Sequence, residues 1–278
     1  TAHATDTIQE MREACGGYGY MAENLLTSLK ADSDIFTTFE GDNVVMMQLA
    51  GKELMTGFSK EIGSFNPLEM VRFGLDNFST LLRRRTAADA LVQNLKDTFS
   101  DSEEATLFDP ASQVRLISER ERRLMVSLGR RLRVAKDMPV EKAAKVVDRA
   151  QDHLLEVAWA HVDRILLEAM LEAEATLTSD TARHVMEQVR DVYFLDLIVR
   201  NGSWYLEQNL LTGTRTKAAR AALNDLVDSL GPWSELLVDA FGVPSEITSV
   251  NLMQRYEDMV TKAESDPAVG QPGRWRED

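Results

Sequence analysis

One acidic residue, Glu40, stands in a setting that suits proton transfer. It lies between Phe39 and Gly41, in a stretch that we expect to form a loop between two helices. Apolar surroundings disfavour the charged form of a carboxylate and raise its pKa, and a raised pKa suits a general base. A single glutamate in a predicted loop is weak evidence, so a structural role for Glu40 stays open on these residues alone.

Two histidines and a glutamate share one predicted helix, at positions His153, Glu156 and His161. Di-metal sites in helical bundles use a Glu that is followed three residues later by a His. Here that order is reversed, and the sequence holds no second motif of this kind. We therefore expect packed or surface histidines and no metal site.

The sequence has one cysteine, Cys15, on the apolar face of a predicted helix beside two glycines. A nucleophilic thiol needs a partner base and a lowered pKa, so we expect a packed thiol. One cysteine also excludes an internal disulfide and a multi-cysteine zinc site. This usage is typical of a reducing compartment, and it predicts a cytoplasmic protein.

Eight basic residues fall within positions 115–136, and Arg83, Arg84 and Arg85 precede them. Such a run could bind phosphate groups, or it could form a solvated face whose charges pair with acidic residues elsewhere. Aromatic residues, which nucleic-acid binding would favour, are not interleaved with the basic ones. We therefore favour ion pairs as the role of this run.

The composition is that of an ordinary globular protein. The 278 residues are 44% hydrophobic and 27% charged, with a net charge of −14. This acidic excess argues against a nucleic-acid partner. The apolar runs, such as residues 44–47, are far shorter than the roughly 20 residues that span a bilayer, so we expect no membrane insertion.

Hydrophobic periodicity predicts helices along almost the whole chain. The expected helices cover residues 5–15, 21–31, 44–58, 67–97, about 25 residues from 110, 140–174, 181–210, 215–230, 232–241 and 245–262. Residues 33–43 interrupt this pattern, because β-branched residues, aromatic residues and Gly41 disfavour a continuing helix. Asp42 or Asn43 is the expected N-cap of the helix that follows. The predicted fold is all-α, a bundle of antiparallel helices.

Gly63 and Pro67 mark a break in the helical pattern over residues 59–66, and we expect a domain boundary there. The predicted domains are residues 1–62 and 63–278, with a loose tail from about residue 264. The sequence starts without Met and enters helical periodicity at once, which favours a part of a larger protein.

Two segments carry a family pattern. Residues 14–20 read A-C-G-G-Y-G-Y, and residues 38–43 read T-F-E-G-D-N. They resemble the acyl-CoA oxidases of the acyl-CoA dehydrogenase superfamily, whose pattern runs A-C-G-G-H-G-Y and then T-Y-E-G-D/E-N. Tyr18 and Phe39 replace the usual His and Tyr. Further similar segments are R-A-Q-D-H-L-L at 149–155, W-Y-L-E at 204–207 and L-V-D-A-F-G-V-P at 237–244.

This resemblance covers residue 10 to about 250, and it implies the C-terminal half of such an enzyme. The first domain would be the end of the dehydrogenase-type C-terminal helical domain. The second would be the additional helical domain of the oxidases, which favours an oxidase over a shorter dehydrogenase.

The resemblance also implies a reaction, in which FAD-dependent α,β-dehydrogenation converts acyl-CoA to trans-2-enoyl-CoA in fatty-acid β-oxidation and oxygen becomes hydrogen peroxide. Glu40 matches the catalytic base. The positions that match cofactor-binding residues are Gly16, Gly17, Asp42 and Asn43, and those beside the substrate are Phe39 and Gly41. A homodimer is the implied assembly. We expect this chain alone to be inactive and to bind no FAD.

Two alternatives stay open. The first is an acyl-CoA dehydrogenase that passes electrons to an electron-transfer flavoprotein. The second is a helical interaction module without catalysis, in which the basic run 115–136 would be the contact face.

Overall fold

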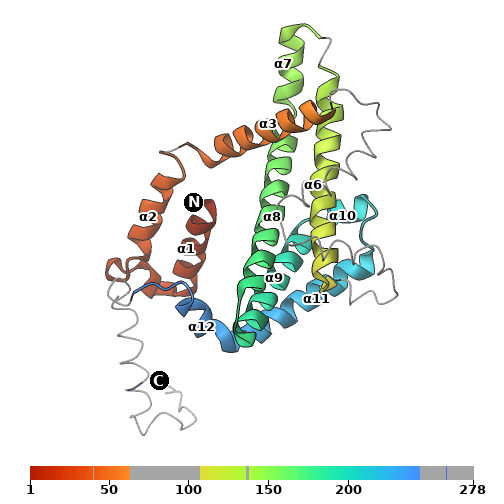
Figure 1. Cartoon of the computed structure of the whole chain (residues 1–278). Coiled ribbons are helices and arrows are strands. Elements are labelled where there is room, and N and C mark those ends of the chain that lie inside the picture. The colour runs from red at the N-terminus through yellow and green to blue at the C-terminus, as the bar shows by residue number, and fades with distance from the viewer. Residues whose placement is uncertain (40, 63–106, 136–137, 245–260, 262–278) are drawn as a thin grey trace, which may run out of the picture. The chain divides into compact units, whose positions relative to one another are not determined.

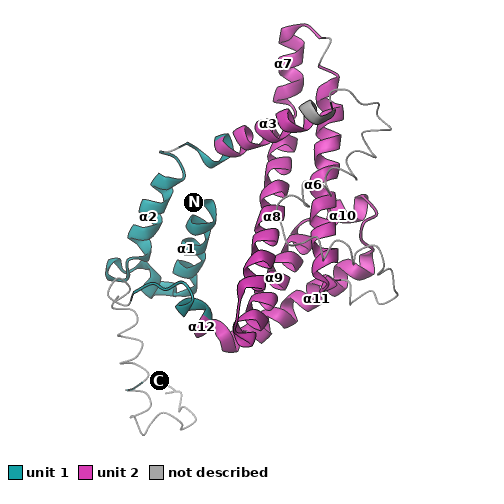
Figure 2. Ribbon diagram, viewed as in Figure 1, with its two compact units in different colours: residues 1–45, 237–278 teal, residues 46–236 magenta. Residues whose placement is uncertain are grey.

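The structure is a computed structural model that describes residues 1–39, 41–62, 107–135, 138–244 and 261 (Figure 1). Every regular element among these residues is a helix, which confirms the predicted all-α fold. The chain divides into two compact units, one of residues 1–45 with 237–278 and one of residues 46–236 (Figure 2). The expected boundary near residue 63 lies outside the described residues and stays a prediction.

The first unit is built on a helical hairpin. Its elements are α1 (Ala2–Ala14), the short 3₁₀ helices η1 (Gly16–Tyr20) and η2 (Ala22–Asn24), and α2 (Leu26–Phe36). The hydroxyl groups of Thr5 and Ser33 form a hydrogen bond, so the start of α1 lies beside the end of α2. At the turn, the Asn24 amide donates to the Tyr18 carbonyl at 2.7 Å.

Helix α2 differs from the prediction, because it begins later than residue 21 and continues through Phe36. Local side-chain contacts offset the low helix propensity of this stretch. Lys30 pairs with Asp34 at 2.6 Å, one helical turn away. The Thr37 hydroxyl also donates to the Asp34 carbonyl at 2.7 Å, which satisfies an acceptor at the end of the helix.

Helix α3 (Asn43–Ile62) begins at the predicted position. The Asp42 carboxylate accepts a hydrogen bond from the Val44 backbone N–H at 2.8 Å. Asp42 is therefore the N-cap. The side-chain oxygen of Asn43 accepts from the Thr1 hydroxyl at 2.8 Å, which joins the start of α3 to the start of α1.

The second unit is built on four long helices among the described residues, α6 (Pro110–Arg133), α8 (Gln151–Thr176), α9 (Asp180–Arg200) and α11 (Gly213–Leu230). The shorter α7 (Val140–Asp148) lies between α6 and α8 in the sequence, and α10 (Gly202–Glu207) lies between α9 and α11. Helix α6 packs on α8, α8 on α9, and α9 on α11 (Figure 1). Asp109 and Ser179 cap α6 and α9 through their side chains, as their position before each helix predicts.

Two of the predicted long helices are broken. The expected helix 140–174 is interrupted at Arg149. The Arg149 carbonyl accepts a hydrogen bond from the Arg131 guanidinium instead of from a backbone N–H of the helix. The expected helix 181–210 is interrupted at Asn201, whose side-chain amide donates to the Leu197 carbonyl at 2.9 Å. Both breaks depend on side chains that bind backbone carbonyls.

The segment expected as helix 232–241 forms η4 (Gly231–Trp233) and α12 (Ser234–Asp239). The expected helices 67–97 and 245–262 fall on residues outside the described ranges, apart from residue 261. The expected loose tail from about residue 264 also lies outside them.

Two apolar cores stabilise the second unit. The first contains Phe194 and Tyr205, both fully buried, with side chains of α6, α8, α9 and α11. The second contains Leu128 and Val157, and partly buried residues of α3 pack against it. One of these is Leu54.

Helix α3 approaches α8 closely at Gly51. A Cβ atom on Gly51 would lie 2.9 Å from the carbonyl oxygen of Leu154 and 2.9 Å from its Cγ. Only glycine fits this contact without a shift of the backbone.

We therefore expect Gly51→Ala to lower the free energy of unfolding by about 1 kcal/mol. Overpacking costs about 1–3 kcal/mol, which exceeds the gain of about 1 kcal/mol from replacing a helical glycine. Gly57→Ala is the matched control on the same helix, because no atom in the described part of the chain lies within 4 Å of its Cβ position. This control should stabilise the protein. Urea denaturation of both variants measures the difference, and equal stabilisation by the two alanines would contradict the close contact.

Candidate functional site

The two segments of the predicted site, residues 14–20 and 38–43, lie apart in the structure. Gly16 and Gly17 follow α1, whereas Asn43 contacts Thr1 at its beginning. Helix α1 has 13 residues, which at 1.5 Å per residue is a length of about 20 Å. The glycine pair and residues 41–43 therefore lie at opposite ends of the hairpin, and Glu40 lies outside the described residues.

The glycine pair presents bare backbone. Gly16 has φ +55, in the left-handed region that favours glycine, and no atom of the described residues lies within 4 Å of the Cβ positions of Gly16 or Gly17. Gly19 has a different role, because a Cβ there would lie 2.1 Å from the Arg12 carbonyl oxygen. Gly19 is thus required for packing, while Gly16 and Gly17 leave room for another molecule to approach.

Backbone turns hold the residues on each side of position 40. The Phe39 N–H donates to the Ile35 carbonyl at 3.0 Å, and the Gly41 N–H donates to the Thr38 carbonyl at 3.1 Å. Gly41 has φ +114, a conformation that other residues rarely adopt. Phe39 is 58% exposed, and its ring stands edge-on to that of Phe36, with 5.3 Å between ring centroids.

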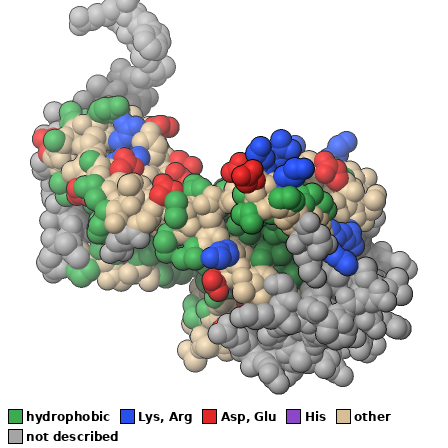
Figure 3. Space-filling view, turned by 90° about the horizontal axis from the view of Figure 1, so that it is seen from above, with side chains coloured by type: hydrophobic (Ala, Val, Ile, Leu, Met, Phe, Trp, Pro, Cys, Tyr) green, Lys and Arg blue, Asp and Glu red, His purple; other side chains and the backbone are tan. Residues whose placement is uncertain are grey.

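The first unit exposes an unusual number of large apolar side chains. They include Met11, Tyr20, Met21, Leu29, Ile35, Phe36, Phe39, Val44 and Val45. Figure 3 shows apolar side chains on the surface of the described residues. Exposed apolar surface of this kind marks contact with a ligand or another polypeptide segment.

Three arginines of the basic run form ion pairs. Arg122 and Arg123 pair with Glu119 at 2.6 and 2.7 Å, and Arg120 pairs with Asp163 at 3.7 Å. Burial raises the pKa of the Glu119 carboxyl, but the hydrogen bonds from Arg122 and Arg123 outweigh it and hold the pKa below its ordinary value. These pairs support the interpretation of the run as a paired face. Lys136 lies outside the described residues.

His161 belongs to a charged network between α6 and α8. Its Nδ1 lies 2.6 Å from Oε1 of Glu121, which is 1% exposed. Arg164 donates to the other oxygen of Glu121 and also to Glu168. His153 is apart from this network, and burial lowers its pKa. The described residues contain no group of side chains that could hold a metal ion.

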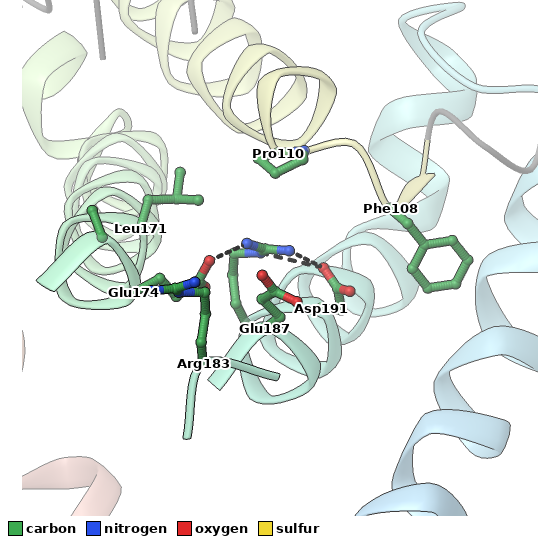
Figure 4. Close-up of a pocket in the computed structure, with 9 residues that line it drawn as sticks. Phe108, Pro110, Leu171, Glu174, Arg183, Glu187 and Asp191 are labelled. Atoms are coloured by element: carbon green, nitrogen blue, oxygen red, sulfur yellow. Dashed lines mark hydrogen bonds and ion pairs between the residues drawn. The ribbon is translucent and has the colours of Figure 1, made fainter. Parts of the chain in front are cut away.

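A second polar network lines a cavity of about 500 Å³ beside α8 and α9 (Figure 4). The buried Arg190 guanidinium donates to Glu174 and, at 3.0 Å, to Asp191. The Gln113 amide also donates to Asp191, at 2.7 Å. Burial raises the pKa of Glu174 despite its contact with Arg190.

The sequence analysis missed this network for a clear reason. Its members come from α6, α8 and α9, and no spacing in the sequence connects them. The adjacent pair Arg190 and Asp191 was the only local signal, and such pairs are common on helix surfaces. One cation shared by two carboxylates stabilises the contact of α8 with α9, and the group includes no nucleophile paired with a base.

Comparison with solved structures defines the class of the fold. The model superposes on Arabidopsis thaliana acyl-CoA oxidase 1 with a TM-score of 0.70, at 21% identity, over 96% of this chain and 38% of that one. For the crystal structure of acyl-CoA oxidase 1 from Yarrowia lipolytica the TM-score is 0.71, at 18% identity, over 98% and 38%. The fold is that of the C-terminal helical part of these oxidases.

Sequence comparison gives the family. Residues 109–252 match the acyl-CoA oxidase family model, and residues 1–55 match the model of the acyl-CoA oxidase C-alpha1 domain. The chain belongs to the acyl-CoA oxidase family, which confirms the resemblance in its motifs. The match over 109–252 supports the oxidase-type second helical domain.

Comparison with curated relatives shows how much of a full-length family member this chain covers. The chain is 28% identical to the mouse acyl-coenzyme A oxidase-like protein, over 88% of this chain and 37% of the relative. It is 27% identical to acyl-coenzyme A oxidase 2, peroxisomal, of Arabidopsis thaliana, over 89% and 34%. The chain thus spans about a third of the relatives that it matches.

The expectation of a cytoplasmic protein is wrong. Several relatives are named as peroxisomal, including the Arabidopsis oxidase 2 and the rat peroxisomal acyl-coenzyme A oxidase 1. The single cysteine indicated only a lack of disulfides, which does not separate one reducing compartment from another. Among the described residues, no helix has the length and apolar character needed to cross a membrane.

We expect Arg190→Met to lower the free energy of unfolding by about 3–5 kcal/mol, since it leaves two buried carboxylates without their cation. Adding Glu174→Gln and Asp191→Asn to Arg190→Met should recover part of this loss, because the charges that the arginine compensates are then absent. Thermal and urea denaturation of the single and triple variants measure both effects. A triple variant that is less stable than Arg190→Met would show that packing, rather than charge, explains the network.

Proposed function

We propose that this chain is the C-terminal helical part of an FAD-dependent acyl-CoA oxidase that converts acyl-CoA to trans-2-enoyl-CoA in fatty-acid β-oxidation. The observation that carries the proposal is the family match, which covers residues 1–55 and 109–252. The second match favours an oxidase over an acyl-CoA dehydrogenase that uses an electron-transfer flavoprotein.

Glu40 is the proposed catalytic base, which accepts the proton from the α-carbon of the thioester. FAD, when bound, supplies the acceptor for the hydride that leaves the β-carbon, and oxygen then takes up those electrons as hydrogen peroxide. The backbone N–H of residue 40 would donate to the thioester carbonyl, where negative charge develops as the α-proton leaves.

The residues beside Glu40 suit a substrate site. Phe39 offers an exposed apolar ring, which would exclude water from the thioester and raise the basicity of the carboxylate. Gly41 supplies the positive φ that the chain needs directly after the base. A larger residue at position 41 would strain this turn.

Gly16 and Gly17 fit a close approach of FAD, because their backbone is exposed and unobstructed. Asp42 and Asn43 already have structural hydrogen bonds, to Val44 and Thr1. Their remaining polar atoms would contact the cofactor. A solved Caenorhabditis elegans acyl-CoA oxidase-2 with the same fold, at a TM-score of 0.67, is bound to FAD, an ascaroside-CoA and ATP.

The separation of the two segments supports a homodimer. A length of about 20 Å divides the glycine pair from residues 41–43, so one flavin ring cannot contact both. We propose that the glycine pair of one subunit contacts the FAD whose reactive ring lies beside Glu40 of the other.

In the full-length protein, Glu40→Gln should leave bound flavin and fold intact but slow flavin reduction by acyl-CoA at least about 100-fold, the usual contribution of a general base. Glutamine keeps the size of the side chain but cannot accept the α-proton. The matched control is Glu53→Gln, an exposed position on α3, which should reduce flavin at the wild-type rate. Stopped-flow absorbance at saturating acyl-CoA measures the rate, and wild-type reduction by Glu40→Gln would refute the assignment.

The 278-residue chain by itself should retain no FAD, because it spans about a third of the related oxidases. Gel filtration of the purified chain after incubation with FAD, followed by visible absorbance, tests this. Co-elution of stoichiometric flavin would show that these helices are sufficient to bind the cofactor.

A further inference from the structure

The guanidinium of Arg12 is held beside the glycine segment of the first unit. Arg12 lies in the last turn of α1, and its Cζ atom stands over the Tyr20 ring, 4.5 Å from the ring centroid. Gly19 packs on the Arg12 carbonyl, because a Cβ atom at Gly19 would lie 2.1 Å from that oxygen. The segment Gly16–Tyr20 therefore folds back on Arg12, and the cation belongs to the same local structure as the glycine pair.

This cation lacks a close anionic partner. Only 13% of the Arg12 side chain is exposed, yet within the described part of the chain its one ion pair is with Glu13, at 3.9 Å. The same Glu13 oxygen already accepts a hydrogen bond from the Gln9 amide, and the Glu13 side chain is 66% exposed. Contact with a ring face stabilises a cation, but it does not satisfy the N–H donors of the guanidinium.

Arginines of the second unit are bonded in a different way. Arg122 donates to Glu119 at 2.6 Å, and Arg164 donates to Glu168 at 2.7 Å. Partly buried polar groups normally have such partners. Among the described residues, no nitrogen of Arg12 is sealed from solvent, so its donors are open to a ligand that the chain itself does not supply.

The chemistry of the site specifies the kind of ligand. A guanidinium presents planar N–H donors that match two oxygens of one phosphate group. Gly16 and Gly17 add exposed backbone without an obstructing side chain, which permits a close approach of that group. The net charge of −14 repels anions at long range, so a phosphate ligand needs a specific cation of this kind.

We propose that Arg12 donates to the phosphate oxygens of a nucleotide diphosphate, and that this diphosphate belongs to the FAD that approaches Gly16 and Gly17. The inference rests on the proposed function for the presence of FAD. It adds a binding residue that lies before the A-C-G-G-Y-G-Y motif. Coenzyme A also contains a diphosphate, so the two ligands are measured separately.

Titration of FAD into the full-length apoprotein tests the contact. Arg12→Met keeps a long side chain and removes the donors, so it should raise the Kd for FAD at least about tenfold, because hydrogen bonds from a charged donor are lost. Arg12→Lys keeps the charge but not the planar pair of donors, and its Kd should lie between those of the wild type and Arg12→Met. Quenching of flavin fluorescence gives each Kd without turnover.

Lys30→Met is the matched control. It removes one positive charge from the same unit, but Lys30 is paired with Asp34 at 2.6 Å, so the Kd for FAD should equal that of the wild type. Added KCl should weaken FAD binding in the wild type, because salt screens the contact between charges. The Arg12→Met protein should show a smaller dependence on salt.

A purely structural Arg12 gives a different result. A cation in the last turn stabilises the end of a helix, and lysine does this as well as arginine. In that case Arg12→Met would lower the Tm of the apoprotein, whereas the FAD affinity of the folded protein and its salt dependence would match the wild type. Thermal denaturation followed by circular dichroism measures the Tm, and this pattern would overturn the proposal.

The remaining outcomes separate the two ligands and the two proposals. An Arg12→Met protein with an unchanged Kd for FAD and a raised KM for acyl-CoA would place the diphosphate of coenzyme A at Arg12, which overturns the flavin assignment. A wild-type full-length protein that binds no FAD would overturn the proposed function itself. Wild-type FAD binding that Arg12→Met leaves unchanged overturns the role of Arg12 alone.

Discussion

The buried carboxylate of Glu121 is the constraint on which the helical bundle depends. A charge that is removed from water costs several kcal/mol unless it is paired and hydrogen-bonded. Here His161 and Arg164 of α8 supply the partners. These contacts require Glu121 of α6 to lie level with His161 and Arg164 of α8. The two cores lie on either side of Glu121 along α6, one at Leu116 and one at Leu124. The charged contact therefore fixes the register of α6 against α8, and the apolar side chains of both cores pack in that register.

Helix α3 connects this bundle with the candidate site along the sequence. It begins directly after residues 41–42, and its later residues Met55 and Phe58 pack against the second core. The close contact at Gly51 restricts how α3 can lie on α8. The residues that follow position 42 and those that pack on the second core thus belong to one helix.

Signals in the sequence were sufficient to predict those features that depend only on neighbouring residues. The N-caps Asp42 and Asp109 follow from a carboxylate that satisfies nearby backbone N–H groups. The break at Arg149 could not be predicted, because its cause is the guanidinium of Arg131 on another helix. The pocket around Arg190 was missed for the same reason. The site motif was found by its residues, and a helix was expected between its two halves, but the packing of α1 on α2 that places these halves at opposite ends of the hairpin was not predicted.

That separation explains why the motif has two halves. In the proposed oxidase the proton and the hydride leave adjacent carbons, so the base and the flavin ring must lie close together at one place. The bare backbone of Gly16 and Gly17, about 20 Å away at 1.5 Å per helical residue, is too distant to serve that chemistry. It is suited instead to a second, non-reacting contact with an extended cofactor. In the proposed homodimer, each end of the hairpin would contact a different cofactor, so the same helices would contribute to both sites.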